Sequence, residues 1–188
     1  MEPALSISAI FVTYKMKDGV TERIMQFKQH FPDSQIIVVD NSPATYKRYA
    51  KLGEALSGIT QLDYIDNPTN SRFTAYNLAC TKISHPYVVF RTDDDTFDEA
   101  TLRAQLVTTQ WQHFAVTPHY FKQDYQIPLS WQRPIEGVIF DTAFLQLLLP
   151  FEEEAGADWT LLERAFTLAS PAYFNQPVLY KAAHGRTV

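Results

Sequence analysis

Three consecutive carboxylates, Asp93, Asp94 and Asp95, form the group of side chains in this sequence that is best suited to chemistry. They follow residues 86–90, a short apolar run whose β-branched and aromatic residues predict a buried strand. A strand that ends in acids places negative charge at the carboxyl edge of a sheet, where open α/β sheets bind ligands. Adjacent carboxylates repel one another, and a divalent cation, usually with a diphosphate on its far side, removes that repulsion.

The same triplet also has a purely structural interpretation. Acidic runs in loops are common as solvated turns, and Asp95 or Asp98 is suited to cap a helix over residues 99–107. The triplet alone is compatible with both interpretations, so the choice between them depends on the predicted elements that position it.

Predicted strands and helices alternate through the first half of the chain. Short apolar runs predict strands, and apolar residues spaced three and four apart predict helices. The expected strands are residues 6–14, 35–40, 62–65 and 87–90, and the expected helices are residues 20–31, 44–56 and 70–83. This alternation predicts an α/β fold with a mostly parallel sheet flanked by helices on both faces.

The second half of the chain is less regular. The expected elements are a strand over residues 114–117, a loop over 121–134, helices over 142–149 and 158–168, and β structure over 173–180. Since no linker or repeat separates the halves, we expect residues 1–188 to form a single domain.

The composition limits the class of protein. A chain of 188 residues with 46% hydrophobic and 20% charged residues has the profile of a soluble globular domain. A net charge of -5 without a cluster of basic residues argues against nucleic acid as a partner. Cys80 is the single cysteine, so no internal disulfide forms, and we expect a cytoplasmic location. No transmembrane segment or signal sequence is expected, which leaves room for peripheral contact with a membrane.

Two common phosphate-binding signatures are absent from the sequence. No G-x-G-x-x-G motif follows the first predicted strand, and no G-x-x-x-x-G-K-[ST] motif occurs. These absences argue against a classical dinucleotide fold and against a P-loop enzyme.

Polar residues lie at four places where predicted strands end or helices begin. They are Thr13-Tyr14, Asp40-Asn41-Ser42, Asn70-Ser71-Arg72 and the acidic triplet. Each is by itself an ordinary turn or cap sequence. In a doubly wound sheet, however, these ends line one crevice, so we expect the four groups to converge.

In this order the motifs resemble a known family. The segments VTYK, IIVVDNS, NPTNSRFTAYNLA and YVVFRTDDDT are similar to those of inverting glycosyltransferases of the family 2 type, which have a GT-A fold. The resemblance covers roughly residues 7–103 and resumes near residues 151–164.

The resemblance implies a nucleotide-sugar site. It assigns Thr13, Tyr14 and Asp40 to the base and ribose, Asn70, Arg72 and Asn77 to the nucleotide pocket, and Asp93 and Asp94 to the substrate. It also implies that Asp93, Asp94 and Asp95 hold Mn²⁺ or Mg²⁺ against the diphosphate, without deciding which acid meets the metal.

The resemblance further implies a catalytic base and a late metal ligand. Asp158 opens a predicted helix in a segment similar to the family's catalytic helix, where it would deprotonate the acceptor hydroxyl. The alternative is an acid in the first turn of a helix, favoured by the helix dipole. His184 would complete the metal shell, or it is an ordinary surface histidine.

Three positions depart from the family pattern. Arg72 stands where the family often has glycine, Tyr76 where it often has arginine, and Ala157 where an acid usually precedes the base. These departures imply an altered choice of sugar or a weakened activity.

We therefore expect a metal-dependent inverting glycosyltransferase that moves a sugar from a nucleotide-diphosphate sugar to a hydroxyl of a glycan or glycoconjugate, and we favour a UDP-sugar as the donor. Residues 1–110 would bind the nucleotide-sugar, and residues 111–188 would bind the acceptor. Two alternatives are a nucleotidyltransferase on a similar sheet and a non-catalytic nucleotide-sugar-binding module. The first normally needs a glycine-rich basic loop after strand one, where residues 15–19 hold a single glycine.

Overall fold

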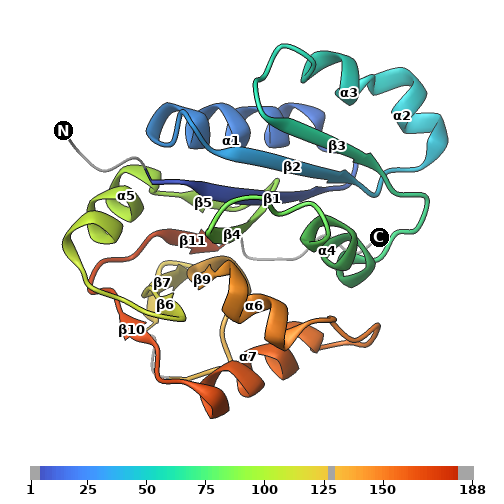
Figure 1. Cartoon of the computed structure of the whole chain (residues 1–188). Helices are drawn as coiled ribbons and strands as arrows, with labels where there is room; N and C mark the ends of the chain where they lie inside the picture. Colours follow the sequence, from blue (N-terminus) through green and yellow to red (C-terminus); the bar gives the residue numbers. More distant parts are fainter. Residues whose placement is uncertain (1–4, 127–129, 182–188) are drawn as a thin grey trace.

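The computed structural model describes residues 5–126 and 130–181 of the chain. Within them, helices cover both faces of a central sheet (Figure 1). The strands are β1 (Ile7–Thr13), β2 (Gln35–Asp40), β3 (Leu62–Asp66), β4 (Tyr87–Thr92), β5 (Thr96–Phe97), β6 (Phe114–Val116), β7 (His119–Phe121), β8 (Asp124–Gln126), β9 (Val138–Asp141), β10 (Ala172–Tyr173) and β11 (Leu179–Lys181). The helices are α1 (Lys17–His30), α2 (Ala44–Ala50), α3 (Leu52–Ala55), α4 (Arg72–Cys80), α5 (Glu99–Thr108), α6 (Thr142–Leu148) and α7 (Ala157–Leu168), with a 3₁₀ turn, η1 (Ile135–Gly137).

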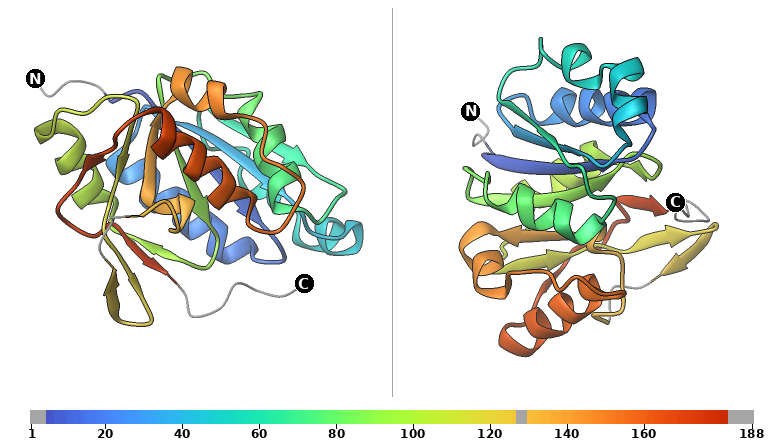
Figure 2. Two further views of the ribbon diagram at one scale, coloured as in Figure 1. Left: turned by 90° about the horizontal axis from the view of Figure 1, so that it is seen from below. Right: turned by 90° about the vertical axis from the view of Figure 1, so that its right-hand side faces the viewer.

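The central sheet is mostly parallel, as the alternation of strands and helices predicted. Its strand order is β10-β6-β9-β4-β1-β2-β3, and β1, β2, β3 and β4 all run parallel. Strand β9 is antiparallel to its neighbours β4 and β6. A second sheet, in the order β5-β11-β7-β8, projects beside it (Figure 2).

The two covered faces of the sheet explain why its central strands β1, β2 and β4 are largely apolar. Alternate side chains of a strand point to opposite faces. Ile10 and Val39 pack with α4, α6 and α7 on one face, whereas Phe11 and Val38 pack with α1, α3 and α5 on the other. All six residues of β2 are buried, so its sequence reads as a continuous apolar run.

The structure corrects three sequence-based expectations. The helix expected over residues 44–56 is two helices, because Lys51 adopts a left-handed conformation with φ of 51° and breaks it. The segment 121–134 was expected to be a loop, but its described part contains the end of β7 and all of β8, joined by a turn with positive φ at Lys122 and Gln123. Strand β9 was not predicted.

Cys80, the single cysteine, is buried in the hydrophobic core. Among residues 5–126 and 130–181, no helix combines the length and the apolar character needed to cross a membrane.

Candidate active site

The predicted polar groups of the first half meet at one edge of the central sheet. In the parallel register, Thr13 at the end of β1 lies opposite Asp40 at the end of β2. On the other side of β1, Val12 lies opposite Thr92, the last residue of β4, so the acidic triplet begins at this same edge. The side-chain amide of Asn41 also donates to the carbonyl oxygen of Ser71 at 3.1 Å, so the four groups expected to converge lie together.

The first acid of the triplet is tied to the end of β1. Asp93 is buried, and its Oδ2 accepts hydrogen bonds from the hydroxyl of Thr13 at 2.7 Å and from the backbone N–H of Tyr14 at 3.0 Å. Gly19 in the first turn of α1 packs against the same acid, since a Cβ atom there would lie 2.6 Å from the carbonyl oxygen of Asp93. These contacts fix the position of Asp93 from two sides.

Asp40 is held in place at the end of β2. Its Oδ1 accepts a hydrogen bond from the backbone N–H of Ser42 at 2.9 Å, and its Oδ2 accepts one from the hydroxyl of Tyr64 at 2.9 Å. Burial and the bond to Asp40 raise the pKa of Tyr64, so the phenol stays protonated and keeps donating. Each carboxylate oxygen has two lone pairs, so Asp40 keeps capacity for a ligand.

Asp95 forms an ion pair with a lysine from a distant part of the chain. Its buried Oδ2 accepts hydrogen bonds from the hydroxyl of Thr92 at 2.7 Å and from the ammonium of Lys181 at 3.0 Å. Lys181 is the last residue of β11, which pairs with β5 directly after the triplet. The second sheet thus brings a positive charge to the acidic edge of the first.

A second cluster of charges surrounds Arg72 at the start of α4. One guanidinium nitrogen of Arg72 lies 3.0 Å from the carboxylate of Glu136 and 3.2 Å from that of Asp158. Its Nε donates a hydrogen bond to the hydroxyl of Tyr76 at 3.0 Å. Glu136 lies in turn 3.7 Å from the ammonium of Lys181, which joins this cluster to Asp95. The contacts therefore run without a break from Asp95 to Asp158.

Charge pairing outweighs burial at the centre of this network. Burial alone would raise the pKa of Glu136, but the nearby Arg72 and Lys181 lower it, so the carboxylate is ionised. Burial alone would lower the pKa of Lys181, but Glu136 and Asp95 raise it, so the ammonium is retained. Both groups are charged at neutral pH.

A cavity of about 560 Å³ opens beside the network. Its walls include Arg72, Arg133, Glu136, Asp158, Trp159 and Lys181. Asp158 lies in the first turn of α7, after Gly156, whose φ of 82° favours glycine. A carboxylate thus faces a space large enough for a small ligand.

Two residues predicted to line the nucleotide pocket, Asn77 and Asn70, take no part in the contacts described above. Asn77 is bound to the backbone of Phe151, donating to its carbonyl at 2.9 Å and accepting from its N–H at 2.8 Å. Asn70 is exposed just before α4. His184, the predicted late metal ligand, lies outside the described residues.

The acidic edge has donors of the kind that Mn²⁺ or Mg²⁺ prefers, because all three residues of the triplet are carboxylates. Within the described segments, no three histidine, cysteine or acidic residues are grouped closely enough to hold a metal ion. Asp95 already attracts a cationic partner in Lys181. The triplet therefore fits a divalent cation by the type of its donors, with Lys181 as a competitor at Asp95.

Several residues of the site carry no signal in the sequence. Glu136, Lys181 and Arg133 are isolated charged residues, and His119 in the cavity wall belongs to no motif. Tyr64, which holds Asp40, lies in a strand that is only partly buried. A pattern search along the chain could not single them out, because their partners are far away in sequence.

Solved structures with a similar fold include a mannosyltransferase and a protein in complex with a nucleotide-sugar. TarS 1–349 of S. aureus in complex with UDP-GlcNAc has a TM-score of 0.75 at 18% identity, over 97% of this chain and 60% of that chain. The mannosyltransferase PcManGT from Pyrobaculum calidifontis, in complex with GDP-Man and Mn²⁺, has a TM-score of 0.69 at 16% identity, over 96% of this chain and 57% of that chain. The chain thus spans less than two thirds of the length of either.

The sequence comparisons differ in their outcome. No curated protein matches the chain by sequence, whereas a family model does. The family model for glycosyl transferase family 2 matches residues 8–167, most of the chain, and the mixed sheet agrees with the expected GT-A-like fold. The chain therefore belongs to glycosyl transferase family 2.

Proposed function

We propose that the chain is a metal-dependent inverting glycosyltransferase that transfers a sugar from a nucleotide-sugar to a hydroxyl acceptor. The observation that carries the proposal is the unbroken set of contacts from Asp95 at the sheet edge, through Lys181, Glu136 and Arg72, to Asp158 in the cavity wall. It links a polar edge suited to a donor with a carboxylate suited to act as a base.

The donor would bind along the carboxyl edge of the sheet, in the half formed by residues 1–110. Asp40 would accept hydrogen bonds from the base or ribose, next to Thr13 and Tyr14. Asn70 and Arg72 would border the nucleotide, and the bonds of Asn77 to Phe151 give it a supporting role instead. The complexes of TarS with UDP-GlcNAc and of PcManGT with GDP-Man support a nucleotide-sugar donor, and we favour a UDP-sugar.

The divalent cation would be held by Asp93, Asp94 and Asp95, with His184 as a further candidate ligand. When bound, Mn²⁺ or Mg²⁺ would stabilise the negative charge of the departing nucleoside diphosphate. Lys181, which contacts Asp95 and Glu136, would compete with the cation at Asp95. The complex of PcManGT with Mn²⁺ supports this assignment.

Asp158 would be the catalytic base. The acceptor hydroxyl oxygen would form a bond to the anomeric carbon, and the bond from that carbon to the diphosphate would break with its electron pair going to the diphosphate oxygen. The hydroxyl proton would pass to the carboxylate of Asp158, which Arg72 orients from 3.2 Å. Attack opposite the leaving group would invert the configuration of the sugar.

One observation favours a second candidate function. Arg72 and Lys181 neutralise the two acids that the mechanism needs, Asp158 and Asp95. A chain locked in this arrangement would bind a nucleotide-sugar without transferring it. Turnover of the nucleotide-sugar, measured as sugar transfer or hydrolysis, distinguishes an enzyme from this binding module.

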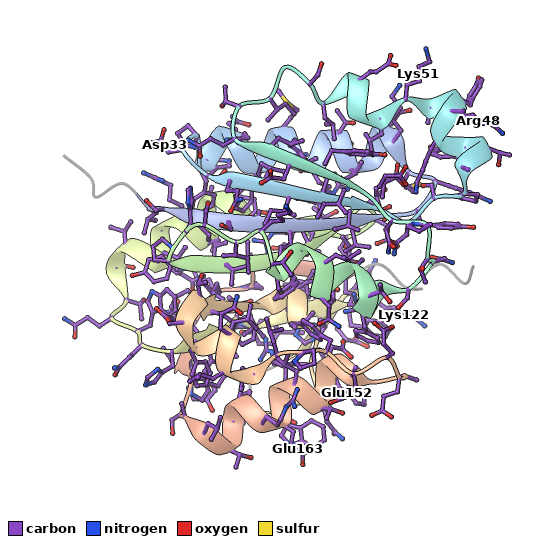
Figure 3. All side chains as sticks on the ribbon, turned by 45° about the vertical axis from the view of Figure 1, so that its right-hand side comes forward. Asp33, Arg48, Lys51, Lys122, Glu152 and Glu163 are labelled. Atoms are coloured by element: carbon purple, nitrogen blue, oxygen red, sulfur yellow. The ribbon has the colours of Figure 1, made fainter. Side chains whose placement is uncertain are left out.

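Calorimetry with UDP and Mn²⁺, followed by an assay of UDP-GlcNAc and GDP-Man hydrolysis, tests the proposal. We expect Mn²⁺-dependent binding of the nucleotide, strong loss of it in Asp93→Ala and Asp95→Ala, and no change in Asp33→Asn, an exposed acid on the surface (Figure 3). Asp158→Asn should bind the donor normally and lose turnover. Failure of the wild type to bind UDP or GDP with Mn²⁺ would refute the proposal, and a wild type that binds the nucleotide but turns over neither UDP-GlcNAc nor GDP-Man would favour the module.

A further inference from the structure

Arg133 is a buried cation whose hydrogen-bonding capacity is largely unused. It lies in the loop before η1 with 3% of its surface exposed. One terminal nitrogen, Nη2, donates to the carbonyl oxygen of Thr117. Its Nε and its Nη1 have no hydrogen-bond partner in the described parts of the chain.

Arg91 shows how this fold treats a buried guanidinium that serves structure. Arg91 is 1% exposed, and its Nε and Nη2 donate to the two carboxylate oxygens of Glu99 at 2.6 and 2.7 Å. No such carboxylate faces Arg133 among the residues that the structure describes. Buried charges in proteins are normally paired, because desolvating an unpaired one is costly. Among the described residues, Arg133 therefore has no anionic partner to offset the cost of burying its charge.

The position of Arg133 points to a ligand as the source of that anion. Arg133 lines the same cavity as the proposed base, Asp158. The two other strong cations of the wall are already engaged, since Arg72 pairs with Glu136 and Asp158, and Lys181 pairs with Glu136 and Asp95. As far as residues 5–126 and 130–181 are concerned, Arg133 is thus the cation of this wall that has no carboxylate partner.

Two further features of the cavity suit an anionic sugar. His119, buried in the same wall, has an Nδ1 atom without a hydrogen-bond partner in the described structure. Trp159 and Phe121 line the cavity with 45% and 39% of their surfaces exposed, and aromatic rings of this kind pack against the apolar face of a sugar.

We propose that the acceptor carries an oxyanion, a phosphate or a carboxylate, which Arg133 binds while Asp158 takes the proton of a nearby hydroxyl. This inference rests on the proposed function, because it assigns the cavity to the acceptor. Arg133 keeps the N–H groups of Nε and Nη1 without a partner in the described structure, and charged N–H donors of this kind bind oxyanions strongly. The anion would restore the pairing that the protein leaves incomplete and would fix the acceptor's orientation.

The main rival occupant is the diphosphate of the donor, which is also an oxyanion. The two assignments differ in a measurable way. If Arg133 binds the acceptor, removing its charge leaves the affinity for UDP unchanged. If it binds the donor, that affinity falls.

The test uses the full chain saturated with UDP and Mn²⁺, so that the donor site is filled. Glucose 6-phosphate, glucuronate and neutral glucose are titrated at constant ionic strength, with calorimetry and tryptophan fluorescence as readouts. We expect at least one of the two anions to bind about 10-fold or more tightly than glucose, and the tighter one identifies the oxyanion. In Arg133→Gln its affinity should fall about 10- to 100-fold, the range for a lost charge-assisted hydrogen bond.

The matched control is Arg48→Gln, which removes the same charge from an exposed site on α2, far from α7 with its labelled Glu163 (Figure 3). It should leave every affinity unchanged. If Arg133→Gln does not fold, Arg133→Lys replaces it, with the same expected direction because an ammonium lacks the planar fork.

Three results would overturn the inference. The first is a wild type, loaded with UDP, that binds neither anion better than glucose, and this would leave the proposed function standing. The second is a loss of UDP affinity in the Arg133 variant, which would assign Arg133 to the donor. The third is a wild type that does not bind UDP at all, which would refute the proposed function and this inference together.

Discussion

Replacing Glu136 by glutamine tests whether the buried charges hold the site together. Glu136 is 2% exposed and contacts two cations, Arg72 at 3.0 Å and Lys181 at 3.7 Å. Breaking a buried ion pair typically costs about 3–5 kcal/mol because a charge is left unpaired. Here the cost should be smaller, since Arg72 keeps Asp158 and Lys181 keeps Asp95. We expect Glu136→Gln to lower the free energy of unfolding by about 2 kcal/mol.

Urea unfolding at neutral pH measures this change. With a urea dependence of about 2 kcal/mol per molar, the midpoint of Glu136→Gln should shift down by about 1 M. Glu163→Gln, an exposed acid on α7 labelled in Figure 3, is the control and should stay within about 0.5 kcal/mol of the wild type.

The pH dependence gives a second check. The pKa of Glu136 is lower in the folded chain than in the unfolded chain, where it is about 4.3. The folded state therefore gains stability from the ionised carboxylate above that value and loses it as pH falls through the folded pKa. The difference in the free energy of unfolding between wild type and Glu136→Gln should have its full size at pH 7 and should shrink below about pH 4. A gap under about 0.5 kcal/mol at pH 7 would refute the reasoning.

Three further predictions concern the rest of the site. Asn77→Ala should lower the free energy of unfolding by about 2 kcal/mol in urea, because two hydrogen bonds to Phe151 are lost, and an unchanged midpoint would contradict this. Lys181→Gln should tighten Mn²⁺ binding in calorimetry, because no ammonium competes at Asp95, and equal or weaker binding would count against the competition. Burial, Arg133 and Lys181 lower the pKa of His119 to about 4, with Glu136 opposing, so the wild type should lose more stability than His119→Gln as pH falls from about 6.5 towards 4, and parallel pH profiles would argue against it.

The sequence was sufficient for the parts of the fold that follow from local patterns. Strand β2 is buried on both faces, so its apolar run and its end at Asp40 were visible without a structure. The edge of the sheet followed from the parallel order, which placed Thr13 beside Asp40 and Asp93. Strand β9 was not visible, because an antiparallel strand inserted beside β4 follows no alternation of strands and helices.

The remaining site residues depend on contacts between distant segments. Glu136 meets Arg72 across 64 positions, and Lys181 meets Asp95 across 86. An isolated glutamate or lysine has the same local sequence whether it is solvated or buried in an ion pair. Which of them reaches the site depends on how distant segments pack together, η1 for Glu136 and β11 for Lys181.

At Gly19, the helix propensity of the residue and the packing of α1 against Asp93 favour different side chains. Alanine is favoured over glycine inside a helix by about 1 kcal/mol, but here its Cβ atom would press on the backbone of Asp93. Because the nearest atom belongs to the backbone, alanine could be accommodated only if α1 or the segment of Asp93 moved. The stability of the fold and the position of the acids therefore depend on the same missing methyl group. A substitution at residue 19 is expected to disturb both together, so glycine is required here even without any ligand at the acidic edge.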